Sequence, residues 1–538
     1  MISKFVSLYT DRNWRNSSRE RSTGLSFANY AAFEAFTINR FRTFWRLFLV
    51  WSNVICEGDR EPVCAGDDCE TAVFFPSLRL NYAENLLSGG GRLIGCYSDG
   101  SRDIFDSLQL RKRVVGFAGF LQQLGVEPGD RIVAIARNNV EVIVAALASA
   151  AIGAVFSSCA HDMGVITALS RFQPLNPKVL VANCASQPWD TGKPLVERVG
   201  EVIAGLSSLQ AIITIDGALP TSLPVHPFAQ AVSDSSGFIW QRFPFNHPLF
   251  ILFSSGTTGT PKCIVHGAGG TLLEHLKEHR LHGDLSRDDR MFFQTSCGWM
   301  MWNWQLSALV GGTEVVVYDG PLKGPETLWE LVAEQQVTVF GTNPAYLQFT
   351  ETAGYAPRTL NLAALRSVLS TGSILYPRQF DWIAEQVKAV PVQSISGGTD
   401  ILGCFVLGNP LLPVYRGQAQ CRSLGLDVRS IPEQAKIGEL ICANPFPSRP
   451  TGFYGEASDR RYHDAYFAQN PGVWTHGDLI EITPHGVIMH GRSDGVMNIR
   501  GVRIGPAEIY RILQQIPLIV EAMAVEQTDE RGRPVGLA

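Results

Sequence analysis

The sequence carries no strong excess of charge and no long uninterrupted apolar run. Its 538 residues include 45 Lys and Arg against 50 Asp and Glu, so the formal net charge is only -5. Nucleic-acid binding needs a concentrated basic face, which this balance does not favour. The longest apolar run, residues 142–156, is interrupted by Ser149 and Gly153 and is shorter than the roughly 20 residues that span a bilayer. We expect no nucleic-acid partner and no membrane span, and we interpret the run as a buried helix.

The chain also lacks a secretory signal and a disulfide pattern. The N-terminal residues contain no long apolar core of the kind that directs secretion. The 11 cysteines are odd in number and irregularly spaced, which is typical of reduced thiols in a cytoplasmic protein. Cys64 and Cys69 lie close together, but no second Cys or His pair stands near them to complete a zinc site. The sequence therefore predicts a cytoplasmic protein without disulfides or structural zinc.

Short β-branched runs alternate with longer helical stretches along most of the chain. The predicted strands are residues 131–136, 178–182, 211–215, 249–253, 314–318 and 337–340. The predicted helices between them include residues 140–150, 271–282 and 326–335. Continuous apolar strands that alternate with helices indicate an α/β protein with largely parallel sheets. The length exceeds that of one simple core, so we expect more than one domain.

The first 85 residues differ from this alternation because they are rich in aromatic side chains and turn residues. Phe41, Phe44, Trp45 and Phe48 follow helical spacing, which predicts a helix buried against the core. We interpret residues 1–85 as a cap that packs on the main domain.

A glycine-rich segment directly follows the predicted strand 249–253. Glycines let successive backbone N–H groups turn inward around anionic oxygens, and hydroxyl groups add movable donors. The lysine at the end of the segment supplies a positive charge for phosphates. The Walker pattern is excluded because Pro261 precedes the lysine and residues 263–266 continue as a predicted strand. We interpret the segment as a triphosphate-binding loop, with a plain turn as the alternative, and its candidate residues are Ser254, Ser255, Gly256, Thr257, Thr258, Gly259 and Lys262.

This segment resembles the phosphate-binding signature of the adenylate-forming superfamily, which includes acyl-CoA synthetases, luciferases and peptide-synthetase adenylation domains. Further motifs of that family follow in its order, and the resemblance covers essentially the whole chain. It implies a large, multi-sheet AMP-binding domain over residues 86–492, then a hinge and a partial small α+β domain over residues 493–538. It also implies ATP, Mg²⁺ and coenzyme A as the cofactor and substrates.

The resemblance assigns nucleotide contacts to three further segments. Thr371-Gly372-Ser373 matches the segment that lies along adenine and ribose. In Ser394-Ile-Ser-Gly-Gly-Thr-Asp400, which includes Gly397 and Gly398, Thr399 would bind the α-phosphate and Asp400 would hold Mg²⁺. Asp400 is shorter than the glutamate that many relatives carry, and an ordinary turn is the alternative interpretation of this segment.

In the third segment, Asp478 matches the turn whose carboxylate accepts both ribose hydroxyl protons. The same family pattern places Arg492 near the ribose, Asp494 at the hinge between the domains and Arg503 near the α-phosphate. Surface positions are the alternative for the two arginines. The resemblance thus implies four catalytic residues, namely Thr257, Lys262, Asp400 and Arg503.

The acid substrate is predicted from residues 298–304, which are similar to acetoacetyl-CoA synthetases rather than to the acetate enzymes. Acetate enzymes usually carry tryptophan at the position of Gly397, and glycine there would leave room for a longer acid. Trp299 and Trp302 would shape the pocket walls, with simple core packing as the alternative. We expect acetoacetate as the substrate, with another short-chain acid as the alternative.

The implied chemistry has two steps and needs no protein nucleophile. The carboxylate attacks the α-phosphorus of ATP and releases pyrophosphate, and the CoA thiolate then displaces AMP. Because the first step brings anions together, Mg²⁺, Lys262 and Arg503 would neutralise charge.

Members of this family also carry an adenylation lysine in a mobile C-terminal domain. Here no lysine follows Lys436, and the sequence ends shortly after Arg503. We expect a C-terminally truncated synthetase with impaired adenylate formation, and a missing domain supplied in trans stays open. A non-catalytic nucleotide or acyl-adenylate binder is the alternative from another class. A Rossmann dehydrogenase is disfavoured because no strand-linked G-x-G-x-x-G occurs.

Overall fold

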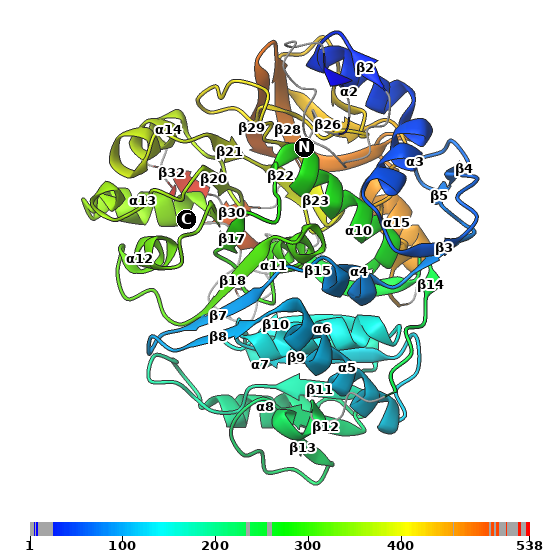
Figure 1. The fold of residues 1–538 in the computed structure, drawn as a ribbon, viewed down its shortest axis with the longest axis vertical. Coiled ribbons are helices and arrows are strands. Elements are labelled where there is room, and N and C mark those ends of the chain that lie inside the picture. Colours follow the sequence, from blue (N-terminus) through cyan, green and yellow to red (C-terminus); the bar gives the residue numbers. More distant parts are fainter. Residues whose placement is uncertain are drawn as a thin grey trace.

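The computed structural model describes residues 25–232, 237–254, 261–455 and 457–493 in full. Outside these ranges it describes Phe5, Leu513 and the short strands β1 (Ser7–Leu8), β30 (Met497–Ile499), β31 (Val502–Ile504), β32 (Glu526–Thr528) and β33 (Pro534–Leu537). The structure shows a multi-sheet α/β fold, which confirms the predicted class (Figure 1).

An eight-stranded sheet with its helices forms the lower and central part of the molecule (Figure 1). Its central strands are buried along nearly their whole length, as expected for a sheet that is covered on both faces. The strand order is β13 (Val225–Pro227), β12 (Ala211–Thr214), β11 (Val179–Ala182), β9 (Arg131–Ala136), β10 (Val155–Ala160), β15 (Pro248–Ser254), β16 (Lys262–Gly267) and β27 (Gly452–Phe453). The accompanying helices are α5 (Ser107–Gln123), α6 (Val140–Ala151), α7 (Val165–Phe172), α8 (Leu195–Ala204) and α9 (Phe228–Ala231).

The predicted helix 140–150 is present as α6, but the apolar run 142–156, interpreted as a buried helix, extends past the end of that helix into a strand. Helix α6 is capped by Asn139, whose side chain accepts from the Val142 N–H, and it ends at Ala151. Gly153 then takes a φ of 73°, and strand β10 begins at Val155. A Cβ at Gly153 would lie 2.5 Å from the Phe243 ring, so the turn requires glycine. Because both elements are fully buried, apolar periodicity could not separate them.

A seven-stranded sheet packs beside the first one and carries helices on the left of Figure 1. All neighbouring strands are parallel except β7 and β8 at one edge. The order is β21 (Val392–Ser394), β20 (Ser367–Ser370), β19 (Val339–Thr342), β17 (Arg290–Phe293), β18 (Glu314–Asp319), β7 (Leu93–Tyr97) and β8 (Arg102–Phe105). Its helices include α12 (Thr327–Glu334), α13 (Pro344–Thr352) and α14 (Pro377–Trp382).

Smaller antiparallel sheets occupy the upper part of Figure 1. One contains β22 (Ser396–Gly398), β23 (Gly403–Leu407) and β24 (Cys421–Arg422). Another contains β25 (Val428–Ile431), β26 (Gly438–Cys442), β28 (Trp474–Thr483) and β29 (Gly486–Arg492). The nearby helices are α10 (Ala268–Lys277), α11 (Met300–Leu306) and α15 (Ser458–Tyr466). Helix α10 continues as a π-helical turn over Glu278–His282, so the predicted helix 271–282 consists of two helical types.

The N-terminal segment is bound tightly to the rest of the chain. It contains β2 (Ser26–Phe27), α2 (Tyr30–Asn39), α3 (Phe41–Trp51), β3 (Cys56–Gly58), β4 (Cys64–Ala65), β5 (Val73–Phe74), β6 (Leu78–Leu80) and α4 (Tyr82–Ser88). Phe44, Trp45 and Phe48 of α3 are completely buried, which confirms the predicted helix.

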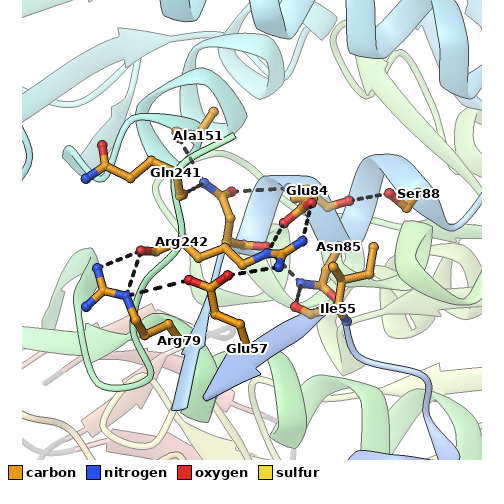
Figure 2. Close-up of polar contacts among 10 residues, drawn as sticks. Ile55, Glu57, Arg79, Glu84, Asn85, Ser88, Ala151, Gln241 and Arg242 are labelled. Atoms are coloured by element: carbon orange, nitrogen blue, oxygen red, sulfur yellow. Dashed lines mark hydrogen bonds and ion pairs between the residues drawn. The ribbon is translucent and has the colours of Figure 1, made fainter. Parts of the chain in front are cut away.

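Figure 2 shows a second link between this segment and the body of the molecule. The Arg242 guanidinium donates to both oxygens of Glu84 at 2.9 Å and to Glu57 at 3.1 Å. Strand β14 (Phe243–Pro244), which follows Arg242, pairs with β6 of the segment. Helix α4 also continues across residue 85, and the domain boundary at that residue stays a prediction.

Three expected absences concern the described part of the chain. All cysteines are free, and all except Cys56 are buried. Within the described ranges, no group of three or more His, Cys, Asp and Glu side chains is arranged to hold a metal ion. None of the described helices is long and apolar enough to cross a membrane.

Candidate functional site

A cavity of about 1000 Å³ lies where the two large sheets meet the antiparallel strands. Four strands, β15, β19, β20 and β21, deliver residues to it at their carboxyl ends. Ligands of α/β proteins bind at this end of a sheet, because the strand-to-helix turns gather there.

The cavity brings together many of the residues predicted from the sequence. The predicted residues that line it are Ser254, Trp299, Gly372, Ser373, Gly397, Gly398, Thr399, Asp478 and Arg492. The predicted residues outside the described ranges are Ser255, Gly256, Thr257, Thr258, Gly259 and Asp494. For Arg503 the structure describes only its backbone in β31, which pairs with β30.

Lys262 and Asp400 form an ion pair directly beside this cavity. Ser254 and Lys262 stand opposite each other in the β15–β16 ladder, so the glycine-rich loop begins and ends next to Lys262. The Lys262 Nζ lies 3.2 Å from the Asp400 Oδ1, and the Asp400 side chain is only 5% exposed. A predicted phosphate-binding lysine and a predicted metal-binding carboxylate, 138 positions apart in sequence, are thus in contact.

Tyr466, which sequence reasoning missed, holds the same carboxylate. Its hydroxyl donates to the Asp400 Oδ1 at 2.5 Å. Burial and the Asp400 charge raise the pKa of Tyr466 well above its ordinary value, so the phenol keeps its proton. The Lys262 Nζ also lies 4.7 Å from the centroid of the Tyr466 ring, within the range of a cation–π contact.

A buried histidine stands next to this group. His266 on β16 is 1% exposed, and burial lowers its pKa to about 3 although the Asp400 charge opposes this. The ring is therefore neutral at physiological pH. It was also missed by sequence reasoning, because its strand reads as an ordinary apolar one.

Gly398 allows the Asp400 carboxylate to approach the cavity wall. A Cβ on Gly398 would lie 3.2 Å from the Asp400 Oδ2 and 2.8 Å from the His476 ring. A larger residue would push one of these side chains away. Glycine at this position therefore has a steric reason as well as the predicted nucleotide contact.

Asp478 and Arg492 form a second ion pair in the wall of the cavity. They stand opposite each other on β28 and β29, and the Arg492 Nη1 lies 3.0 Å from the Asp478 Oδ1. Their side chains are 7% and 12% exposed. The His476 Nε2 lies 3.5 Å from the Asp478 Oδ2. A carboxylate anchored in this way and facing a cavity can accept hydrogen bonds from a pair of ligand hydroxyls.

Part of the cavity lining is apolar. Trp299, Met300 and Met301 line it at the start of α11. Trp302 does not: it is completely buried and stacks on Phe156, with ring centroids 6.4 Å apart. Successive helical positions differ by about 100°, so one step along α11 turns the side chain from the cavity into the core. Trp302 is thus a packing residue, the alternative that the sequence left open.

Gly397 has a structural reason for lacking a side chain. A Cβ there would lie 2.0 Å from the Gly403 carbonyl oxygen and 2.5 Å from the Cys404 Cα on the paired strand β23. No side chain fits unless β23 shifts. The effect of Gly397 on acid length stays a prediction, but its replacement would also disturb the β22–β23 pairing.

Further lining residues were not predicted. Asn343 directly follows β19, caps α13 by accepting from the Tyr346 N–H, and lines the cavity with Gln348 and Phe349. Because ligands of α/β proteins bind at strand ends, the position of Asn343 shortly after a predicted strand could have identified it. Arg171 on α7 lines the cavity as well, and nothing in its local sequence indicates this.

Comparisons with known proteins agree with this geometry. Residues 108–432 match the family described as AMP-binding enzyme. The acetoacetyl-coenzyme A synthetase of Rhizobium meliloti is 41% identical over 94% of this chain and 80% of its own length. The acetoacetyl-CoA synthetase of Gallus gallus is 38% identical over 95% of this chain and 81% of its own length. The solved acetoacetyl-CoA synthetase from Streptomyces lividans superposes with a TM-score of 0.83 at 36% identity, covering 93% of this chain and 80% of that one.

Proposed function

The chain belongs to the AMP-binding enzyme family and, within it, to the acetoacetyl-CoA synthetases, and on this premise we propose that it is an acid–thiol ligase. It converts acetoacetate, ATP and coenzyme A to acetoacetyl-CoA, AMP and pyrophosphate.

The observation that supports this proposal most directly is that one cavity is lined by both charged and apolar side chains. Asp478 and Arg492 line it, and the Lys262–Asp400 pair lies next to its lining residues Ser254 and Thr399. Trp299 and the two methionines that follow it also line the cavity. ATP fits the charged groups by its phosphates and hydroxyls, and a short, mostly apolar acid fits the apolar ones. We call the part of the cavity beside the Lys262–Asp400 pair the phosphate end.

The two steps use these residues in distinct ways. In the first, an acetoacetate carboxylate oxygen bonds to the α-phosphorus as the bond to pyrophosphate breaks, which gives the acyl-adenylate. Lys262 offsets the charge that gathers when these anions meet, and Asp478 orients the nucleotide by accepting from its ribose. In the second, the CoA thiolate bonds to the acyl carbon and AMP leaves. Thr257 and Arg503 are included in the proposed site only because they match the family motifs.

Magnesium fits at Asp400 by the chemistry of the donors. Mg²⁺ prefers oxygen ligands and is usually held by one or two carboxylates together with substrate phosphates. Asp400 is one buried carboxylate at the phosphate end, and the described ranges contain no larger ligand cluster. Bound there, the ion would neutralise phosphate charge.

The test is AMP formation from ATP, Mg²⁺ and coenzyme A with a panel of acids that includes acetoacetate, acetate, butyrate and 3-hydroxybutyrate. We expect acetoacetate to give the highest kcat/KM, with acetoacetyl-CoA formed in equal amount to AMP. A higher kcat/KM for another acid would overturn the choice of substrate. ATP binding in calorimetry without AMP from any acid would favour the nucleotide-binding alternative.

A further inference from the structure

We propose that Tyr466 is a positioning residue that fixes the Asp400 carboxylate and the Lys262 ammonium at the phosphate end of the cavity. This inference rests on the proposed function, because ATP phosphates and their metal ion are what these two groups would meet. Tyr466 lies on α15, outside every motif that the sequence singled out.

Tyr466 makes one contact with each of the two functional groups. Its hydroxyl donates to the Asp400 Oδ1 at 2.5 Å, the same oxygen that faces the Lys262 Nζ at 3.2 Å. Its ring face lies 4.7 Å from the Lys262 Nζ. Both groups are therefore located relative to one rigid aromatic side chain.

The position of Tyr466 is set by packing rather than by the cavity. The side chain is 2% exposed, and its ring stacks on Trp474 at 3.9 Å with an interplanar angle of 16°. Phe453 and Tyr462 contact it edge-on, at 5.8 Å and 5.3 Å between ring centroids. An aromatic side chain held on several sides has little rotational freedom, so its hydroxyl is a preorganised donor.

The Tyr466 hydroxyl matters because the Lys262 ammonium could contact either Asp400 or bound phosphates. An ammonium group that turns toward bound phosphates weakens its contact with Asp400, since one point charge serves both. The Tyr466 hydroxyl then still holds the Asp400 Oδ1. The Oδ2 stays on the side of Gly398, at 3.2 Å from the position that a Cβ there would take, and Gly398 lines the cavity. Tyr466 thus determines which carboxylate oxygen faces the phosphate end.

The test variant is Tyr466→Phe, which keeps the ring, its stacking on Trp474 and its face toward Lys262 but removes the hydroxyl. The matched control is Tyr462→Phe on the same helix and in the same aromatic cluster. The Tyr462 hydroxyl contacts Arg449 at 3.1 Å and the Pro450 carbonyl at 3.3 Å, and makes no contact with Asp400.

Two readouts separate positioning from folding. Calorimetry measures ATP binding at several Mg²⁺ concentrations without acid or coenzyme A, and steady-state assays measure kcat and the KM for ATP. We expect Tyr466→Phe to raise the Mg²⁺ concentration needed for half-maximal ATP binding about tenfold and to lower kcat about 10- to 100-fold, as the loss of a charge-assisted hydrogen bond predicts. The melting temperature and ATP binding without metal stay near wild type, and Tyr462→Phe changes neither readout.

A double-mutant cycle with Asp400→Asn keeps the proposal falsifiable even if Tyr466→Phe is less stable. If Tyr466 acts through Asp400, adding Tyr466→Phe to Asp400→Asn changes the Mg²⁺ dependence by less than about twofold. Full additivity, a wild-type Mg²⁺ dependence in Tyr466→Phe, or equal losses in Tyr462→Phe would each overturn the proposal. Failure of the proposed ligase function would show instead as no AMP from any acid in wild type, and the binding measurement would still decide the role of Tyr466.

Discussion

Two groups of charged and polar side chains differ in their exposure: one lies around Lys262 at the start of β16, and the other lies on helix α10, which follows that strand. The site cluster consists of Lys262, Asp400 and Tyr466, and Asp400 directly follows the lining residue Thr399. The core cluster consists of Glu274, Lys277, Glu278, His279 and His282 on α10 and its π-helical turn, and all five are at most 2% exposed.

In the core cluster, the charged groups form hydrogen bonds with other buried groups of the protein. The Glu278 Oε1 accepts from the Cys404 N–H at 2.6 Å, and its Oε2 accepts from the Trp304 Nε1 at 2.5 Å. Lys277 donates to Glu274 and to Ser423 at 2.6 Å. Burial raises the pKa of Glu278, with a further contribution from the Glu274 charge. A shifted pKa therefore does not by itself identify a functional site.

In the site cluster, by contrast, Lys262 retains 20% exposure and stands at the end of the glycine-rich loop. The same residue types are thus used for two purposes. Changes in the site cluster should reduce activity at constant stability, and changes in the core cluster should do the reverse.

The largest expected effect is on activity, from Lys262→Met. Removal of the ammonium while a similar stem length is kept should lower the rate of AMP formation by about 10²- to 10³-fold, because charge at the phosphates is no longer offset. The melting temperature should remain within about 2 °C of wild type, since the side chain is partly exposed. Initial rates and differential scanning calorimetry check these two expectations. A large loss of stability would contradict the expected difference between the site cluster and the core cluster.

The next effect is on stability, from Glu278→Gln in the core cluster. An amide can accept from only one of the two N–H donors and turns its own NH₂ toward the other. A buried donor without an acceptor costs about 1–3 kcal/mol in the free energy of unfolding. Urea denaturation measures this, with the exposed Glu127→Gln as the control. If Glu278→Gln is as stable as wild type but has altered acid selectivity, the core cluster is part of the functional site.

A smaller effect is expected for Asp478→Asn, which tests the ribose end of the cavity. The amide keeps the shape but can no longer accept two hydroxyl protons, and it weakens the 3.0 Å pair with Arg492. The KM for ATP should rise about tenfold while kcat changes less, as expected for a lost charge-assisted hydrogen bond. An unchanged KM for ATP would mean that Asp478 does not contact the ribose.

The smallest effect is a pH dependence from His282 in the core cluster. Burial lowers the pKa of His282 to about 3, whereas the unfolded side chain protonates near its ordinary value of about 6.5. The unfolded state therefore binds the proton first, so the contribution of His282 to stability is complete above about pH 6.5 and is lost as pH falls.

Between pH 7.5 and pH 5.5 this loss amounts to about 1.3 kcal/mol. His282→Asn should remove that part of the pH dependence, whatever it does to stability at pH 7.5. Urea midpoints of both proteins at the two pH values measure the difference. Parallel curves for the two proteins would mean that His282 is protonated in the folded state.

Much of the fold could be predicted because its strands are apolar and its strand ends carry polar or glycine-rich turns. Residues 131–136 form β9 as predicted, and the predicted nucleotide-binding segments at Thr371–Ser373 and Gly397–Thr399 line the cavity. The interpretation of residues 142–156 as a buried helix holds as far as Ala151 and fails beyond it, because a buried helix and a buried strand have similar apolar compositions.

The missed parts of the site depend on contacts between distant positions. Tyr466 reaches Asp400 from 66 positions away, through a helix whose sequence indicates only a polar surface element with some aromatic residues. Trp302 was assigned to the pocket because residues 298–304 resemble acetoacetyl-CoA synthetases, whereas the point at which α11 starts decides which of these side chains face the cavity. Local sequence contains neither of these relations.

The most direct test of ATP-dependent acid activation in this cavity is acetoacetate-dependent pyrophosphate release by wild type and by Asp400→Asn. We expect pyrophosphate release by wild type and a rate about 10²-fold or more lower in Asp400→Asn, at an unchanged melting temperature. Equal rates in the two proteins would contradict it, because the buried carboxylate that contacts Lys262 and Tyr466 would then have no part in the reaction.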